Sequence, residues 1–177
     1  MIVDKIMRLS VFILYIASFQ VSAIDIPIKI TGIVQIPPCK INNGNEIIVY
    51  FKSISITDLS NGKNWREVSV PVSCTYSQGT AYVKIKGTAL GSNDNVLATN
   101  INNFGIALYQ GTGTTTKLIL GDGEYNGQNS IGYPIKSGLT GKENGLFTFT
   151  AVPFKEGSDE LSAGEFSASA NMSISYF

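Results

Sequence analysis

Apolar and polar residues alternate one by one along both ends of this sequence. Near the carboxyl end, every second residue from Phe166 to Tyr176 is apolar and the residues between them are mostly polar. Near the amino end, a similar run begins at Ile24 and continues to Val34. Successive side chains of a β-strand point to opposite faces, so each run predicts a strand with one apolar and one polar face. Taken alone, this alternation favours the ordinary first and last strands of a β-sandwich.

The sequence between the two ends is typical of short strands joined by tight turns. Apolar and β-branched runs predict strands at residues 46–51, 68–74, 81–86, 105–109, 117–120 and 146–154. The segments between them contain turn-forming pairs such as Asn61-Gly62, whose residues tolerate positive φ angles. No segment of a dozen residues repeats apolar residues with a helical period. The sequence therefore predicts one all-β domain, an antiparallel sandwich or barrel, with little helix.

The composition argues against most kinds of catalytic or metal site. The chain of 177 residues contains no histidine, which removes histidine-based nucleophile pairs and histidine-ligated metal sites. The 13 basic and 13 acidic residues balance and form no basic run, so nucleic-acid binding is not expected. The Gly121-Asp122-Gly123-Glu124 segment lacks the spacing of a calcium loop and is interpreted as a turn. We expect no catalytic residues, no cofactor and no metal.

The first 23 residues have the pattern of an export signal. Lys5 and Arg8 precede an apolar run at 9–19, and Val21-Ser22-Ala23 supplies the small residues that a signal peptidase requires. A membrane anchor is the alternative, but a run of about a dozen residues is shorter than the roughly 20 that span a bilayer. We therefore expect residues 1–23 to be cleaved, with no membrane insertion of the mature chain. Met7 is an alternative start codon.

The two cysteines, Cys39 and Cys74, allow only one intramolecular pairing. Export makes a disulfide chemically permissible, and closing this loop of about 35 residues would contribute roughly 4 kcal/mol to stability. In antibody domains a tryptophan packs on a disulfide that joins the two sheets. Trp65 does not have the spacing for that arrangement. The sequence therefore predicts a sandwich with a different disulfide topology.

Residues 32–44, the middle segments 95–101 and 104–111, and the end from Gly164 to Tyr176 resemble parts of the chaperone–usher pilins, the fimbrial subunits of Gram-negative bacteria. Residues 32–44, GIVQIPPCKINNG, resemble the start of these pilins. At the other end, Gly164 is fourteenth from the carboxyl terminus and Tyr176 is penultimate. The middle segments 95–101 and 104–111 are most similar to minor tip pilins. The resemblance implies an incomplete immunoglobulin-like β-sandwich that lacks its last strand, with an N-terminal donor-strand extension at 24–36 and a pilin domain at 37–177.

The resemblance also assigns roles to the two alternating ends. In this family a chaperone fills the groove of a subunit during transit, and the N-terminal extension of the next subunit replaces it in the fibre, a form of β-strand addition called donor-strand complementation. The residues that would enter a neighbour's groove are Ile26, Ile28, Ile30, Gly32 and Val34. The strand that would line this subunit's own groove and bind the chaperone contains Gly164, Phe166, Ala168, Ala170, Met172, Ile174 and Tyr176, and ends at Phe177. The terminal carboxylate of Phe177 would be held by basic residues of the chaperone.

These roles imply a non-catalytic minor fimbrial subunit that reaches the cell surface through the periplasm. The implied partners are a periplasmic chaperone, an outer-membrane usher, a tip adhesin and neighbouring pilins. We favour the adaptor that links the adhesin to the fibre, although a fibrillum subunit and a terminator would share both end patterns. The alternative from another class is a carbohydrate-binding adhesin, in which exposed tyrosines such as Tyr82, Tyr109 and Tyr133 would bind sugar. An enzyme is a third and weaker alternative.

Overall fold

The computed structural model describes residues 24–177 except positions 60 and 140. These residues fall into two units, 24–34 and Gln35–Phe177, which are described separately. The predicted export signal at 1–23 lies outside the described residues. The predicted boundary between extension and domain, at 36/37, stays a prediction.

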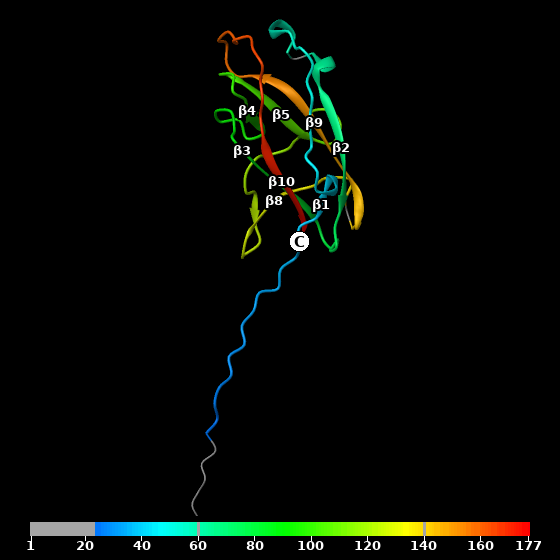
Figure 1. Cartoon of the computed structure of the whole chain (residues 1–177), viewed down its shortest axis with the longest axis vertical. Coiled ribbons are helices and arrows are strands. Elements are labelled where there is room, and N and C mark those ends of the chain that lie inside the picture. Colours follow the sequence, from blue (N-terminus) through cyan, green and yellow to red (C-terminus); the bar gives the residue numbers. More distant parts are fainter. Residues whose placement is uncertain (1–23, 60, 140) are drawn as a thin grey trace, which may run out of the picture. The chain divides into compact units, whose positions relative to one another are not determined.

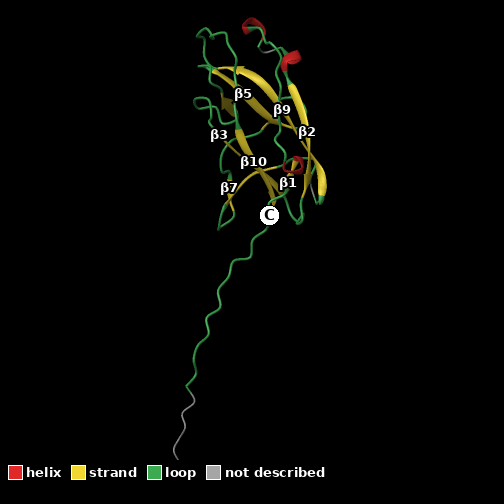
Figure 2. Ribbon diagram, in the orientation of Figure 1, coloured by secondary structure: helices red, strands yellow, loops and turns green. Residues whose placement is uncertain are grey.

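The second unit is built from two β-sheets (Figures 1 and 2). One sheet has the strand order β1-β2-β9-β5-β4, with β6 paired to β5. The other has the order β10-β3-β8-β7. All of the strand pairs in the two sheets are antiparallel. The strand bounds are β1 Lys40–Ile41, β2 Arg66–Ser73, β3 Ala81–Gly87, β4 Val96–Ala98, β5 Phe104–Gln110, β6 Thr116–Lys117, β7 Glu124–Tyr125, β8 Ser130–Pro134, β9 Asn144–Lys155 and β10 Ala170–Tyr176.

Alternation within the long strands produces the core between the sheets. On β2, Val70 and Val72 are buried while their neighbours are exposed, and on β9 Phe147 and Phe149 are buried. From the opposite sheet, β3 and β10 contribute further buried side chains, including Ile174. These side chains belong to one apolar cluster. The prediction of an antiparallel sandwich is therefore confirmed.

Helical structure in the described residues is limited to three single 3-10 turns, as the sequence predicts. These are η1 Asn42–Gly44, η2 Ile56–Asp58 and η3 Gly62–Asn64. The first contains consecutive left-handed residues, with φ of 47° at Asn42, 55° at Asn43 and 84° at Gly44. Asparagine and glycine adopt this conformation most readily, which explains the sequence of this turn.

The strands predicted at 68–74, 81–86, 105–109 and 146–154 correspond to β2, β3, β5 and β9. The strand predicted at 117–120 is shorter than expected, because β6 ends at Lys117 and the amide of Leu120 then donates to the carbonyl of Asp94. The short strands β1, β4, β7 and β8 were not predicted.

The predicted strand at 46–51 is wrong as a member of a sheet. Ile47, Val49 and Phe51 are half-buried while Ile48 and Tyr50 are exposed, so the side chains keep the period of a strand. Residues 46–54, however, form no backbone–backbone hydrogen bond with any described part of the chain. Alternation decides which side chains face the core, but a sheet strand also needs a neighbour for its main-chain groups. Here that neighbour is missing.

The disulfide between Cys39 and Cys74 is present, with an S–S distance of 2.04 Å. It joins the residue before β1 to the residue after β2, two neighbouring strands of one sheet. This differs from a bridge between the two sheets, as predicted from the position of Trp65. Both cysteines are buried at the edge of the core.

Replacing both cysteines by alanine should lower the free energy of unfolding by about 4 kcal/mol, because the unfolded chain loses the constraint on a loop of about 35 residues. The measurement is a thermal melt of the exported protein with and without a reductant. The melting temperature of the natural chain should fall on reduction, and that of the double variant should not respond. The expectation would be contradicted if the natural chain melted at the same temperature with and without the reductant, once a mass measurement had verified free thiols in the reduced sample.

Candidate binding groove

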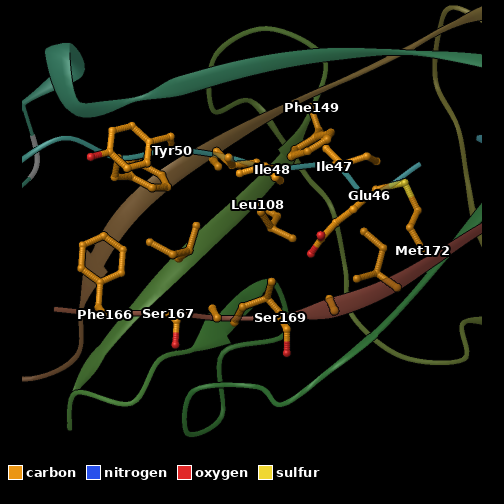
Figure 3. A pocket seen from close by; sticks show the side chains of 18 of the residues that line it. Glu46, Ile47, Ile48, Tyr50, Leu108, Phe149, Phe166, Ser167, Ser169 and Met172 are labelled. Atoms are coloured by element: carbon orange, nitrogen blue, oxygen red, sulfur yellow. The ribbon is translucent and has the colours of Figure 1, made fainter. Parts of the chain in front are cut away.

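A long groove opens along the side of the sandwich, between residues 44–56 and residues 161–173 (Figure 3). Its volume is about 1440 Å³. The floor is made of core side chains from both sheets, among them Ile85, Leu97, Phe104, Ile106, Leu108 and Phe149. In Figure 1 the cyan segment before β2 and the red β10 run along the two sides of this region. The groove is therefore mostly apolar and exposes the edge of the core.

The two sides of the groove lack backbone partners over most of their length. Residues 46–54 form no ladder, and β10 begins only at Ala170, although the alternation predicts a strand from Phe166. The groove closes at one end, where the amide of Cys39 donates to the carbonyl of Ile174 over 2.8 Å. Between that contact and Leu161 there is an elongated space with unpaired main chain on both sides.

The predicted groove residues divide into two groups. Gly164, Phe166, Ala168, Ala170 and Met172 line the groove. Ile174 and Tyr176 share the same face of the strand but are completely buried in the core and do not line it. The Tyr176 hydroxyl donates to the carbonyl of Lys142 over 3.1 Å, which fixes the end of the strand.

The chain ends beside Thr80. The backbone of Phe177 donates to Thr80 and accepts from it, at 3.0 and 2.9 Å, and its ring packs edge-on to Tyr82. The last residue is thus held in a fixed position. The predicted contact of its carboxylate with a chaperone stays a prediction.

Three aromatic rings meet at the open end of the groove. The ring of Phe166 lies 4.9 Å from that of Phe104 on the floor and 5.9 Å from that of Phe51 on the opposite side, measured between ring centroids. The Arg66 guanidinium lies 5.5 Å from the centre of the Phe51 ring. Phe166 was predicted from the alternation, whereas its partners come from segments 115 and 62 residues away in the sequence. No local pattern in the sequence indicates such a contact.

Asn100 takes the place of a neighbouring strand at residues 165–167. Its side-chain nitrogen donates to the carbonyl of Glu165 over 3.0 Å, and its side-chain oxygen accepts from the amide of Ser167 over 2.8 Å. An asparagine amide can make this pair of bonds because it carries one donor and one acceptor group side by side, as a peptide group does. Asn100 was not predicted as a site residue, and a single loop asparagine carries no sequence signal for this role.

The amino-terminal unit, residues 24–34, forms neither strand nor helix. Its apolar side chains are strongly exposed, from 80% for Ile26 to 98% for Val34. A Cβ placed on Gly32 would have no atom within 4 Å. The described structure thus gives the apolar face of this segment no partner.

The ion pairs of the described residues lie outside the groove. Asp122 contacts Lys86 at 3.0 Å and Lys84 at 3.9 Å, and Asp94 contacts Lys117 at 2.8 Å. The hydrogen bond from Lys86 lowers the pKa of Asp122, helped by the charge of that lysine and a hydrogen bond from Ser130. None of the ion pairs within the described residues involves a side chain that lines the groove.

No group of three or more metal-binding side chains occurs within the described residues. None of the helices in that part of the chain is long and apolar enough to cross a membrane.

The comparisons with known proteins agree with this geometry. Residues 28–177 match the model of a family described as fimbrial protein. The chain belongs to the fimbrial protein family. It is 43% identical over 170 residues to the fimbrial adapter PapF of Escherichia coli, covering 96% of this chain and 98% of the relative. It is 42% identical to the minor fimbrial protein PrsF of the same species, with the same coverage.

Solved structures of fimbrial subunits have the same fold. The P pilus adaptor subunit PapF matches with a TM-score of 0.56 and 38% identity, over 81% of this chain and 98% of that one. A subunit from the structure of a chaperone–usher pilus matches with a TM-score of 0.55 and 19% identity, over 88% and 100% of the two chains. The second match supports the fold alone. This fimbrial protein therefore has the incomplete immunoglobulin-like pilin fold, as predicted, and is an extracellular pilus component.

Replacing Asn100 by alanine should free the main chain at residues 165–167. Each lost hydrogen bond costs about 1 kcal/mol, so we expect the amide of Ser167 to exchange with solvent roughly fivefold faster. The measurement is hydrogen exchange of the full chain.

Asn64→Ala is the matched control, because the Asn64 side chain also donates to a backbone carbonyl, that of Asp58, at another site. It should leave the exchange of Ser167 unchanged. An unchanged exchange rate in Asn100→Ala would show that the groove edge is held by other contacts.

Proposed function

We propose that this fimbrial protein is the adaptor that links a tip adhesin to the pilus fibre by donor-strand exchange. The observation that carries the proposal is the coexistence in one chain of an open apolar groove and an exposed alternating extension. The extension at 24–36 would fill the groove of the preceding subunit, and the groove would receive the extension of the following one. The protein would need no catalytic residue for this role, and the family is a structural one.

The energetics are large enough to drive assembly without a nucleotide. Burying four side chains of isoleucine size contributes about 6–12 kcal/mol before entropy costs, which is comparable to the net stability of a whole domain. The added strand would also bond to the unpaired main chain on both sides of the groove. Because an unpaired apolar edge is prone to aggregation, we infer that a periplasmic chaperone occupies the groove until assembly at an outer-membrane usher.

The relatives support the adaptor over the lectin alternative. They are a fimbrial adapter and a minor fimbrial protein, and neither name describes a sugar-binding protein. Tyr109 and Tyr133 are half-buried within β5 and β8, and Tyr82 is half-buried and packs against Phe177. These positions do not favour a sugar-binding surface made of exposed tyrosines.

Adding a donor strand in cis should stabilise the fold. We compare residues 24–177 with a chain that repeats residues 24–36 after Phe177 through a short flexible linker. If the added strand raises the free energy of unfolding by several kcal/mol, the melting temperature of a chain of this size should rise by about 10 °C or more. The measurement is a thermal melt followed by circular dichroism, together with the loss of aggregation.

The matched control carries Ile28→Asp and Ile30→Asp in the added strand only, which places charges on its apolar face. This control should lose the gain, whereas Lys29→Asp on the polar face should keep it. If the plain chain is already a stable monomer and the added strand changes nothing, the donor-strand proposal is wrong.

Replacing Gly32 by leucine should block incorporation into fibres and leave chaperone capture intact. The resemblance places this glycine where the donor strand approaches its neighbour most closely, so a side chain there would clash. The measurement is co-purification with the chaperone and, separately, the amount of the subunit in isolated pili. Thr31→Leu, on the opposite face of the same segment, is the control and should assemble. Loss of chaperone capture in Gly32→Leu would mean that the donor strand is misassigned.

A further inference from the structure

One carboxylate points into the otherwise apolar part of the groove. In Figure 3 the oxygens of Glu46 are directed into the space between Leu108 and Met172. Its side chain is exposed while the groove is empty. Among the described residues, no hydrogen bond or salt bridge to this carboxylate is formed.

The main chain at Glu46 is held in place by the turn that precedes it. The side-chain nitrogen of Asn42 donates to the carbonyls of Asn45 and Glu46, at 3.2 and 3.0 Å. The same turn contains the three consecutive left-handed residues of η1, which direct the chain into the side of the groove. The base of the Glu46 side chain is therefore fixed next to the groove, near its closed end at Cys39 and Ile174.

A strand that fills the groove changes the surroundings of this carboxylate. It removes water from the space between Leu108 and Met172, and burying a carboxylate without a partner is strongly unfavourable. A lysine or arginine on the incoming strand would replace the lost water with a charge-assisted hydrogen bond. An apolar side chain at that position would leave the carboxylate unpaired.

We propose that Glu46 makes the groove select a donor strand that carries lysine or arginine at the groove-facing position opposite this carboxylate. This inference rests on the proposed donor-strand function and specifies the chemistry of the partner. The selection acts through the cost of the wrong occupant as well as the attraction of the right one.

The chain's own extension lacks this feature. The residues expected to face a groove are Ile26, Ile28, Ile30, Gly32 and Val34. None of them is basic, and Lys29, the basic residue of this segment, lies on the opposite face. In every register that keeps this face toward the groove, a second copy of this chain would place an apolar side chain or Gly32, and no positive charge, against Glu46. The groove therefore disfavours the addition of the same subunit twice in succession.

The test uses the full mature chain and five peptides of residues 24–36, acetylated at the amino end so that only side chains carry positive charge. One peptide is the natural sequence, and each of the others replaces one residue with lysine, at Ile26, Ile28, Ile30 or Val34. Binding to the natural chain, to Glu46→Gln and to Glu46→Leu is measured by titration and by the melting temperature of the complex. Glu165→Gln, which alters another groove-lining carboxylate, is the control.

We expect one of the four lysine-substituted peptides to bind the natural chain at least tenfold more tightly than it binds Glu46→Gln. The natural peptide should show the reverse order and bind Glu46→Leu most tightly. Glu165→Gln should leave this pattern unchanged. Because all five peptides carry Lys29, general attraction between charges would act at every position and would not select one.

Three outcomes would overturn the inference. If each of the four lysine substitutions weakens binding by the same factor, both to the natural chain and to Glu46→Gln, the carboxylate faces solvent and selects no donor strand. In that case, binding of the natural peptide leaves the donor-strand function intact. If the natural peptide binds the natural chain most tightly of all, the groove accepts a second copy. If no peptide binds or stabilises any variant, the proposed function fails together with the inference.

Discussion

The unmade hydrogen bonds on the two sides of the groove are the constraint on which the rest of this structure depends. Backbone amide and carbonyl groups need partners, and a sheet edge with an apolar side is stable in a soluble protein only when it is covered. Residues 46–54 and 165–169 face each other across the exposed core without a strand between them. Local hydrogen bonds fix the main chain on each side, from Asn42 in the η1 turn on one and from the Asn100 side chain on the other.

The long strands could be predicted because their residues satisfy two conditions at once. In β2 and β9 the side chains alternate and each strand also has a hydrogen-bonded neighbour on both sides, so the alternation and the backbone pairing both indicate a strand. At 46–51 the pattern is present but the neighbour is absent, and the sequence cannot reveal that difference. The short strands β1, β4, β7 and β8 have the opposite character, since they are held by pairing and are too short to show a period.

The sequence indicated groove residues on the side formed by 161–173, but not on the side formed by 44–56. Alternation and the resemblance to pilins identified Phe166 to Met172, but they also included Ile174 and Tyr176, which the facing sheet covers completely. A period of two assigns a residue to a face and does not say how far that face is covered. Phe51, Asn100 and Glu46 were missed as site residues because their roles depend on contacts between segments far apart in the chain.

The groove and the extension differ in the charges that they carry. Head-to-tail contacts between identical subunits continue without limit, because each added copy presents the same surface again. A subunit that forms a junction needs a groove and an extension that differ in what they accept and offer. In this chain the face of the extension that would enter a groove carries no charge, and the groove contains the Glu46 carboxylate beside Leu108 and Met172. One carboxylate at the groove would thus give direction and order to an assembly whose driving force is otherwise the burial of apolar surface.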